Sequence, residues 1–85
     1  MRIVYKKHFN RQFKKLSPKI KEQFYERLEI FLMDKFASQL NNHSVERAFP
    51  GCRSINITGD YRALFQEEES FLVFVFIGAH SDLYG

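Results

Sequence analysis

The sequence predicts an α+β domain in which an N-terminal strand and a two-helix hairpin pack on a four-stranded sheet, in the order β-α-α-β-β-β. Residues 71–77 are apolar throughout and rich in Val and Phe, which is typical of a strand buried on both faces. Two earlier segments place apolar residues at helical spacing, and residues 52–66 alternate around a turn. A chain of 85 residues has room for one domain, 1–85, with one modest core.

The first segments predict a strand and a short helix. Residues 2–5 alternate between faces and predict a brief strand. Residues 8–16 follow, with Phe9, Phe13 and Leu16 on one helical stripe and basic side chains elsewhere, which predicts an amphipathic helix.

A second, longer helix is predicted to start at Ser17-Pro18. A serine hydroxyl suits the N-cap, and proline suits the first helical position, where its missing N–H costs nothing. The helix is expected to fray over 34–38. Its predicted apolar stripe comprises Ile20, Phe24, Leu28, Phe31, Leu32 and, as a last contact, Phe36.

The second half predicts a three-strand meander. Residues 40–44 form a polar connector, and Pro50-Gly51 forms a turn. The strand over 52–57 is expected to alternate, with Arg53, Ile55 and Ile57 on one face and Cys52, Ser54 and Asn56 on the other. Turns at 58–60 and 67–70 then bound the strands over 61–66 and 71–77.

The strand order follows from the last strand. A strand that is apolar on both faces needs a neighbour on each side, and the meander supplies only one. The strand over 2–5 is therefore placed beside 71–77, giving the order first, fourth, third, second. Both helices are expected to cover the apolar face of this sheet.

The net charge of +3 conceals an asymmetry along the chain. Residues 1–21 contain no acid, whereas the rest of the chain holds all ten carboxylates. A cationic block attracts polyanions; the alternative is a solvated lysine-rich face that keeps the protein soluble. The basic residues of this block are Arg2, Lys6, Lys7, Arg11, Lys14, Lys15, Lys19 and Lys21.

Cysteine content and hydropathy indicate a reducing cytoplasm. Cys52 is the single cysteine and permits no internal disulfide, and no signal peptide or membrane span is recognised, so no membrane partner is expected. Three scattered histidines without paired ligands do not predict a metal site, and no nucleotide-binding loop or serine elbow is present, so no cofactor is expected.

Five residues are the candidates for chemistry: His43, Asp60, Arg62, His80 and Tyr84. Antiparallel pairing places the start of the third strand, with Asp60 and Arg62, beside the end of the fourth, where His80 follows. An acid, a guanidinium and an imidazole are thus expected within reach of one phosphate.

These residue types suit RNA cleavage without a metal. Histidine can move a proton to or from a ribose or leaving oxygen, arginine can neutralise a pentavalent phosphorane, and Tyr84 can stack on a base. Each has a structural alternative: Asp60 as a turn residue, Arg62 as cover for the sheet, His43 as a loop residue, His80 as a cap, and Tyr84 as terminal packing.

Three stretches resemble the RelE/ParE superfamily of type II toxins, and its YafQ-like branch most closely. They are His-Ser-Val-Glu-Arg-Ala-Phe-Pro-Gly-Cys-Arg over 43–53, Gly-Asp-Tyr-Arg-Ala-Leu-Phe over 59–65, and Ile-Gly-Ala-His-Ser-Asp-Leu-Tyr-Gly over 77–85. The resemblance spans the chain, and the final stretch is its most specific part. It implies a RelE-like fold and a toxin paired with a cognate antitoxin. It also implies metal-independent cleavage of mRNA in the ribosomal A site.

The resemblance also implies roles for residues. His43, Asp60 and His80 match catalytic positions of the YafQ branch, with His80 as general acid and either His43 or Asp60 as base; Tyr84 matches a terminal aromatic, and Arg62 an arginine aimed at the scissile phosphate. The residues expected to contact messenger or ribosomal RNA are Arg47, Arg53 and Asn56, together with Lys6 and Lys7 just before the first helix and Arg11, Lys14 and Lys15 within it.

The sequence departs from the family pattern at two positions. Asn56 stands where the YafQ branch has a histidine, and Arg47 replaces a glycine. Because asparagine cannot take a proton near pH 7, reduced or lost cleavage is one alternative. A non-catalytic toxin that binds DNA gyrase, as on the ParE-like side of the superfamily, is another.

Overall fold

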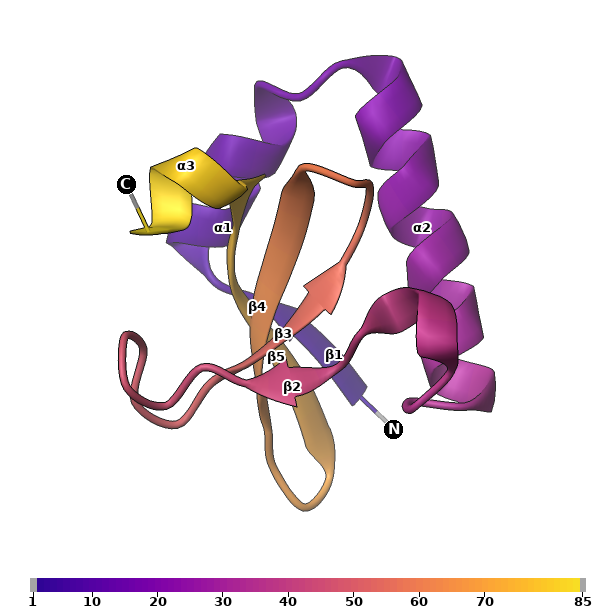
Figure 1. Ribbon diagram of the computed structural model, residues 1–85, viewed down its shortest axis with the longest axis vertical. Helices are drawn as coiled ribbons and strands as arrows, with labels where there is room; N and C mark the ends of the chain where they lie inside the picture. The colour runs from indigo at the N-terminus through magenta and orange to yellow at the C-terminus, as the bar shows by residue number, and fades with distance from the viewer. Residues whose placement is uncertain (1, 85) are drawn as a thin grey trace.

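The computed structural model describes residues 2–84, with the backbone alone for Tyr84, and shows two helices packed on one face of a mixed five-stranded sheet (Figure 1). The elements in chain order are β1 (Arg2–Tyr5), α1 (Lys7–Lys14), α2 (Pro18–Met33), the 3-10 turn η1 (Ser38–Leu40), β2 (His43–Ser44), β3 (Arg53–Asn56), β4 (Tyr61–Glu67), β5 (Phe71–Ala79) and α3 (His80–Tyr84).

The sheet has the order β1-β5-β4-β3-β2. β1 pairs with β5 in parallel, and the other pairs are antiparallel. The predicted order of four strands is confirmed, and β5 has a neighbour on each side. The fifth strand, β2, was not predicted because its two residues, His43 and Ser44, are too few to show a period-two pattern.

Both helices begin and end close to the predicted positions. Ser17 caps α2, since its Oγ accepts a hydrogen bond of 3.3 Å from the Ile20 backbone N–H, and Pro18 is the first helical residue. The predicted stripe of α2 is correct for Phe24, Leu28 and Phe31, which are buried.

The end of the predicted α2 stripe is wrong. Leu32 is 52% exposed, because successive steps of four residues drift around an α-helix and carry it to the edge of the apolar stripe. Phe36 is 61% exposed, because α2 ends at Met33 and Phe36 no longer follows its stripe.

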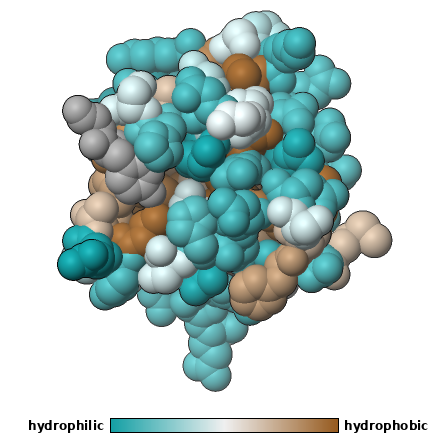
Figure 2. All heavy atoms as spheres, viewed as in Figure 1, coloured by the Kyte–Doolittle hydropathy of each residue, from teal (hydrophilic) through white to brown (hydrophobic). Residues whose placement is uncertain are grey.

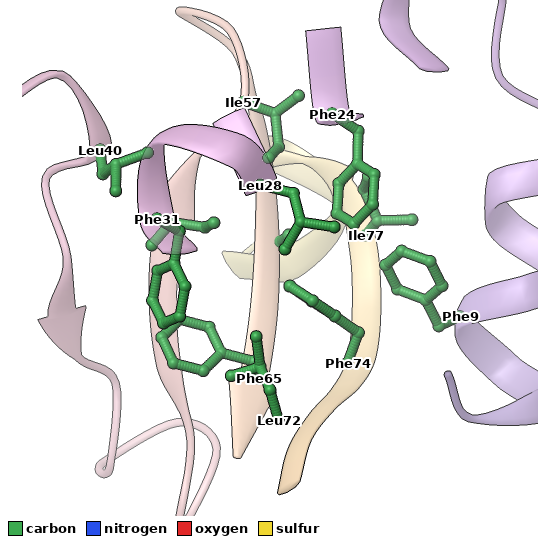
Figure 3. Packing of buried hydrophobic residues seen from close by; sticks show 12 residues of the cluster. Phe9, Phe24, Leu28, Phe31, Leu40, Ile57, Phe65, Leu72, Phe74 and Ile77 are labelled. Carbon is green, nitrogen blue, oxygen red and sulfur yellow. The ribbon is translucent and has the colours of Figure 1, made fainter. Parts of the chain in front are cut away.

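The core lies between the sheet and the two helices and is dominated by aromatic rings. Figure 3 shows Phe9 from α1, Phe24 from α2 and Phe74 from β5 lying close together. Their ring centroids are 5.4 Å apart for Phe9 and Phe24, 5.2 Å for Phe24 and Phe74, and 5.6 Å for Phe9 and Phe74. The packing of these rings ties both helices to β5.

The end of β5 differs from the predicted polar tail. β5 extends to Ala79, and the chain then forms the single-turn helix α3. Asp82 Oδ2 accepts a hydrogen bond of 3.2 Å from the Ala79 backbone N–H and so holds the start of this turn. His80 therefore lies at a defined junction between strand and helix.

Candidate functional site

The face of the sheet opposite α1 and α2 carries a smaller apolar cluster and a polar pocket. The buried residues of the cluster are Val45, Cys52, Leu64 and Leu83. In the view of Figure 2, hydrophilic residues cover most of the surface, and apolar residues gather at the left, between α3 and the loop that joins β2 to β3. We call this side of the sheet the open face.

The polar pocket on the open face has a volume of about 220 Å³. Its lining residues come from the end of η1, from β2, β3 and β4, and from the start of α3; they are Asn41, His43, Ser54, Arg62 and His80. Three of the five candidates predicted from the sequence thus share one pocket.

Strand pairing brings these residues together. Arg62 pairs with Gly78 across β4 and β5, and the His80 backbone N–H donates a 2.8 Å hydrogen bond to the Asp60 carbonyl. At the other side, His43 pairs with Ser54 across β2 and β3. The predicted proximity between the start of β4 and the end of β5 is therefore correct.

The Arg62 guanidinium is held by the turn that precedes it. Its NH1 group donates to the carbonyl oxygens of Thr58, Gly59 and Tyr61 at 3.0, 3.1 and 3.1 Å. Its Nε and NH2 groups make no hydrogen bond with any residue that the structure describes. One edge of the guanidinium is therefore fixed, and the other donors can bind an anion in the planar geometry that phosphate favours.

The His43 ring has a defined tautomer. Its Nδ1 lies 2.7 Å from the Asn41 carbonyl oxygen, and because a carbonyl can only accept, Nδ1 carries the proton. Asn41 itself adopts the left-handed backbone conformation, with φ of 46°, which asparagine tolerates better than most residues. The hydrogen bond leaves Nε2 as the nitrogen of His43 that can exchange a proton.

The lining of the pocket is suited to an anion. Within residues 2–84, its lining contains one permanent cation, Arg62, and two imidazoles, those of His43 and His80, and no acidic side chain. A guanidinium with free donors beside two proton-exchanging rings can bind a phosphate group and move protons around it.

Of the other two predicted catalytic residues, only Asp60 has a side chain that the structure describes, and it lies away from the pocket. The Asp60 side chain is exposed and does not line the pocket, although its backbone carbonyl binds the His80 N–H. The Tyr84 side chain lies outside the described residues, so its predicted stacking role stays a prediction.

The predicted RNA-contacting residues near the pocket lie in three settings. Asn56 pairs with Arg62 across β3 and β4. Arg47 lines a neighbouring hollow of about 370 Å³ that shares His43 with the pocket. Arg53 points to the other face of β3, where its Nε donates a 2.8 Å hydrogen bond to Asn42 Oδ1.

The cationic block presents exposed side chains at Lys6, Lys7, Arg11, Lys14 and Lys15. Lys15 lines a hollow together with Gly78 and Asp82, next to the strand end that carries the pocket. The basic surface of α1 therefore reaches the same end of the sheet as Arg62 and His80.

Sequence reasoning missed two lining residues of the pocket, Asn41 and Ser54. Ser54 is fully buried, with 0% of its surface exposed, although it belongs to the more polar side of an alternating strand. The signal that could have found it is a small polar residue placed on the same face as Asn56.

Within residues 2–84, no group of three His, Cys, Asp or Glu side chains is arranged to hold a metal ion. In the same part of the chain, no helix has the length and apolar character needed to span a bilayer.

Comparison with known proteins rests on structure. No protein-family model matches the sequence, and no curated protein matches it. The fold is similar to that of YafQ from E. coli strain BL21(DE3), with a TM-score of 0.78 and 20% identity over 100% of both chains. It is also similar to the YoeB/ParE toxin from Agrobacterium tumefaciens, with a TM-score of 0.78 and 15% identity over 94% of this chain and 99% of that one.

A third similar structure is the RelB-RelE antitoxin-toxin complex from Methanococcus jannaschii, in which the matched chain gives a TM-score of 0.73 and 13% identity. The match covers 95% of this chain and 94% of that one. The resemblance drawn from the sequence is thus confirmed for the fold: this chain has the α+β fold of the YafQ, YoeB/ParE and RelE toxins.

Proposed function

We propose that this protein is the toxin of a type II toxin–antitoxin pair and that it cleaves mRNA in the ribosomal A site without a metal ion. The observation that carries the proposal is the pocket on the open face, where His43, Arg62 and His80 line one anion-sized space. The fold that this chain shares with YafQ and RelE toxins also supports the proposal of a toxin.

The proposed reaction is attack of a ribose 2′-oxygen on the adjacent phosphate. His43 Nε2 takes the 2′ proton, a bond forms between the 2′-oxygen and phosphorus, and the bond from phosphorus to the 5′-oxygen breaks. His80 gives a proton to the departing 5′-oxygen. The products are a 2′,3′-cyclic phosphate and a 5′-hydroxyl, so atoms and protons balance.

The placement of the candidates favours His43 over Asp60 as the base. His43 lines the pocket, has its Nδ1 proton fixed by Asn41 and keeps Nε2 for proton exchange, whereas the Asp60 side chain does not line the pocket. Arg62 stabilises the charge that grows on the phosphorane, through the donors that the turn carbonyls leave unused.

The remaining residues act on the position of the RNA. Asn56, opposite Arg62, orients the nucleotide without exchanging a proton, and Tyr84 stacks on a base. Arg47, Arg53 and the exposed basic residues of α1 contact RNA phosphates. Counterion release gives such contacts a strong dependence on salt.

The proposed partner in the resting cell is a cognate antitoxin. Structures similar to this one include the E. coli DinJ-YafQ complex and the RelB-RelE complex. We expect the antitoxin to cover the cationic surface of α1 and the residues of α3 and so to keep the protein inactive in the cytoplasm.

Induced expression in bacteria tests the proposal. The wild-type protein is expected to arrest growth and to leave 2′,3′-cyclic phosphate ends on translated mRNA, mapped by primer extension on stalled ribosomes. His43→Ala, Arg62→Ala and His80→Ala should each relieve the arrest at equal protein levels. Equal arrest by all four proteins would remove the site assignment, and gyrase inhibition without mRNA cuts would favour the ParE-like alternative.

A further inference from the structure

Ser54 has a hydroxyl group with no hydrogen-bond partner in the described part of the molecule. Its side chain is completely buried, and Oγ is closed to solvent. A buried polar group without a partner destabilises the folded state, because it has lost its hydrogen bond to water and gained none in return. Such groups are rare in folded proteins, and each needs a physical reason.

The position of Ser54 provides that reason. Ser54 lies on β3, pairs with His43 on β2, and lines the pocket that also contains Arg62 and His80. Asn56, two residues further along the same face of β3, has a buried Oδ1 that likewise has no hydrogen-bond partner among the described residues. The polar atoms that lack partners are therefore grouped on the part of the open face where the chemistry is proposed.

The charge of the pocket indicates the ligand. Among the described residues, its lining has a guanidinium, two imidazoles and no carboxylate, so it favours an anion with several acceptor oxygens. A serine hydroxyl can donate to such an oxygen. Rotation about the Cα–Cβ bond moves Oγ among three staggered positions, and Ser54 already borders the pocket, so the hydroxyl can turn toward a bound ligand.

We propose that Ser54 is a phosphate-binding residue of the pocket, whose hydroxyl donates a hydrogen bond to a non-bridging oxygen of the same phosphate that Arg62 holds. The proposal rests on the proposed function for the source of the phosphate, an RNA strand. In the free protein the unpartnered hydroxyl costs stability, and in the bound protein the phosphate supplies the missing partner.

The test measures binding and stability together. ¹⁵N-labelled wild-type protein, Ser54→Ala and Arg62→Ala are titrated by NMR with inorganic phosphate and with adenosine 3′-phosphate, ligands too small to engage the basic surface of α1 at the same time. Ser54→Ala is expected to raise both dissociation constants about tenfold, as for the loss of one hydrogen bond to a charged group. Its midpoint of urea unfolding should equal or exceed that of the wild type.

Ser70→Ala is the matched control, since Ser70 is exposed in the turn between β4 and β5, at the far end of that hairpin. Ser70→Ala should leave the dissociation constants for inorganic phosphate and adenosine 3′-phosphate unchanged. The proposal would be overturned by any of three results: Ser54→Ala binds phosphate as tightly as the wild type, the wild type does not bind phosphate, or Ser54→Ala is clearly less stable.

Primer extension separates this inference from the proposed function. Wild-type mRNA cleavage, with Ser54→Ala binding and cutting equally well, would leave the function standing and remove the role of Ser54. Phosphate binding that depends on Ser54 and Arg62, with no mRNA cuts by the wild type, would support the phosphate site and remove the proposed reaction.

Discussion

The two faces of the sheet differ in what they bury. The face covered by α1 and α2 buries an aromatic core in which the rings of Phe9, Phe24 and Phe74 contact one another. The open face buries a smaller apolar cluster and leaves a pocket lined by charged and polar side chains. One face therefore supplies most of the buried core, and the other carries the polar groups of the proposed site.

The same strands serve both faces. In β3, Ile55 points into the core while Ser54 lines the pocket, and in β4, Ala63 and Phe65 join the core while Arg62 reaches the pocket. Because side chains alternate along a strand, the core on one side fixes the positions of the polar residues on the other. Substitutions on the two faces should therefore have separable effects.

The largest effect is expected from Phe74→Ala on the covered face. Removing this buried ring should lower the free energy of unfolding by about 3–5 kcal/mol, because a cavity replaces contacts with both helices. Urea unfolding followed by circular dichroism measures the change. Phe71→Ala is the control, since Phe71 lies on the same strand and is 39% exposed; an equal loss for both would contradict the proposed division of the faces.

Arg62→Ala, on the open face, should reduce activity and leave stability nearly unchanged. We expect mRNA cleavage to fall by roughly 10²–10³-fold, as for the loss of one preorganised donor group, while the protein stays folded. Arg27→Ala is the matched control, because its Nε donates to the Ile57 carbonyl from α2, on the covered face. A comparable loss of cleavage in both variants would show that the effect does not arise at the pocket.

Ser17→Ala tests the start of the covering helix α2. The serine hydroxyl accepts the Ile20 N–H, and its removal should cost about 1 kcal/mol of unfolding free energy while cleavage is retained. Ser38→Ala is the control, since Ser38 is exposed and lies inside η1 rather than at its N-cap, Ala37; it should leave the unfolding free energy nearly unchanged. Equal urea midpoints for Ser17→Ala and the wild type would mean that the cap does not stabilise α2.

The smallest expected effect is a loss of folding stability at alkaline pH. Burial raises the pKa of the Tyr5 phenol above its usual value of 10.0, with a further contribution from Tyr25. The folded protein then holds this proton more tightly than the unfolded chain, so stability is lost as pH rises above about 10. Tyr5→Phe should show a smaller loss than the wild type in urea unfolding between pH 8 and pH 11, and parallel curves would refute the assignment to Tyr5.

The core and the strand order could be predicted because they depend on hydrophobic patterns that extend over many residues. The Phe24, Leu28 and Phe31 stripe of α2 reflects burial, which is readable from spacing. The apolar run of β5 is buried on the face toward the helices, but Phe71 is 39% exposed and the residues on the other face are half-buried, so the prediction of burial on both faces is only partly correct. Strand β2 could not be predicted, because two residues carry no period and their pairing with β3 depends on tertiary contacts. The exposure of Leu32 could have been predicted, because repeated steps of four residues rotate it to the edge of the apolar stripe.

The pocket could be predicted only in part. Arg62 and His80 follow from the register between β4 and β5, which antiparallel pairing makes calculable. The displacement of Asp60 from the pocket depends on the shape of the turn, and the burial of Ser54 depends on β2 lying beside it. Both are consequences of short elements whose geometry is set by their neighbours.

The parallel pairing of β1 with β5 joins segments from opposite ends of the described chain. A contact between such distant segments raises the contact order and places the closing of the sheet late in folding. During synthesis, β1 has no partner until β5 has left the ribosome. His80 follows β5, so the pocket lacks this lining residue until the same stage. The sheet is therefore expected to be complete only after both ends of the described chain have been synthesised.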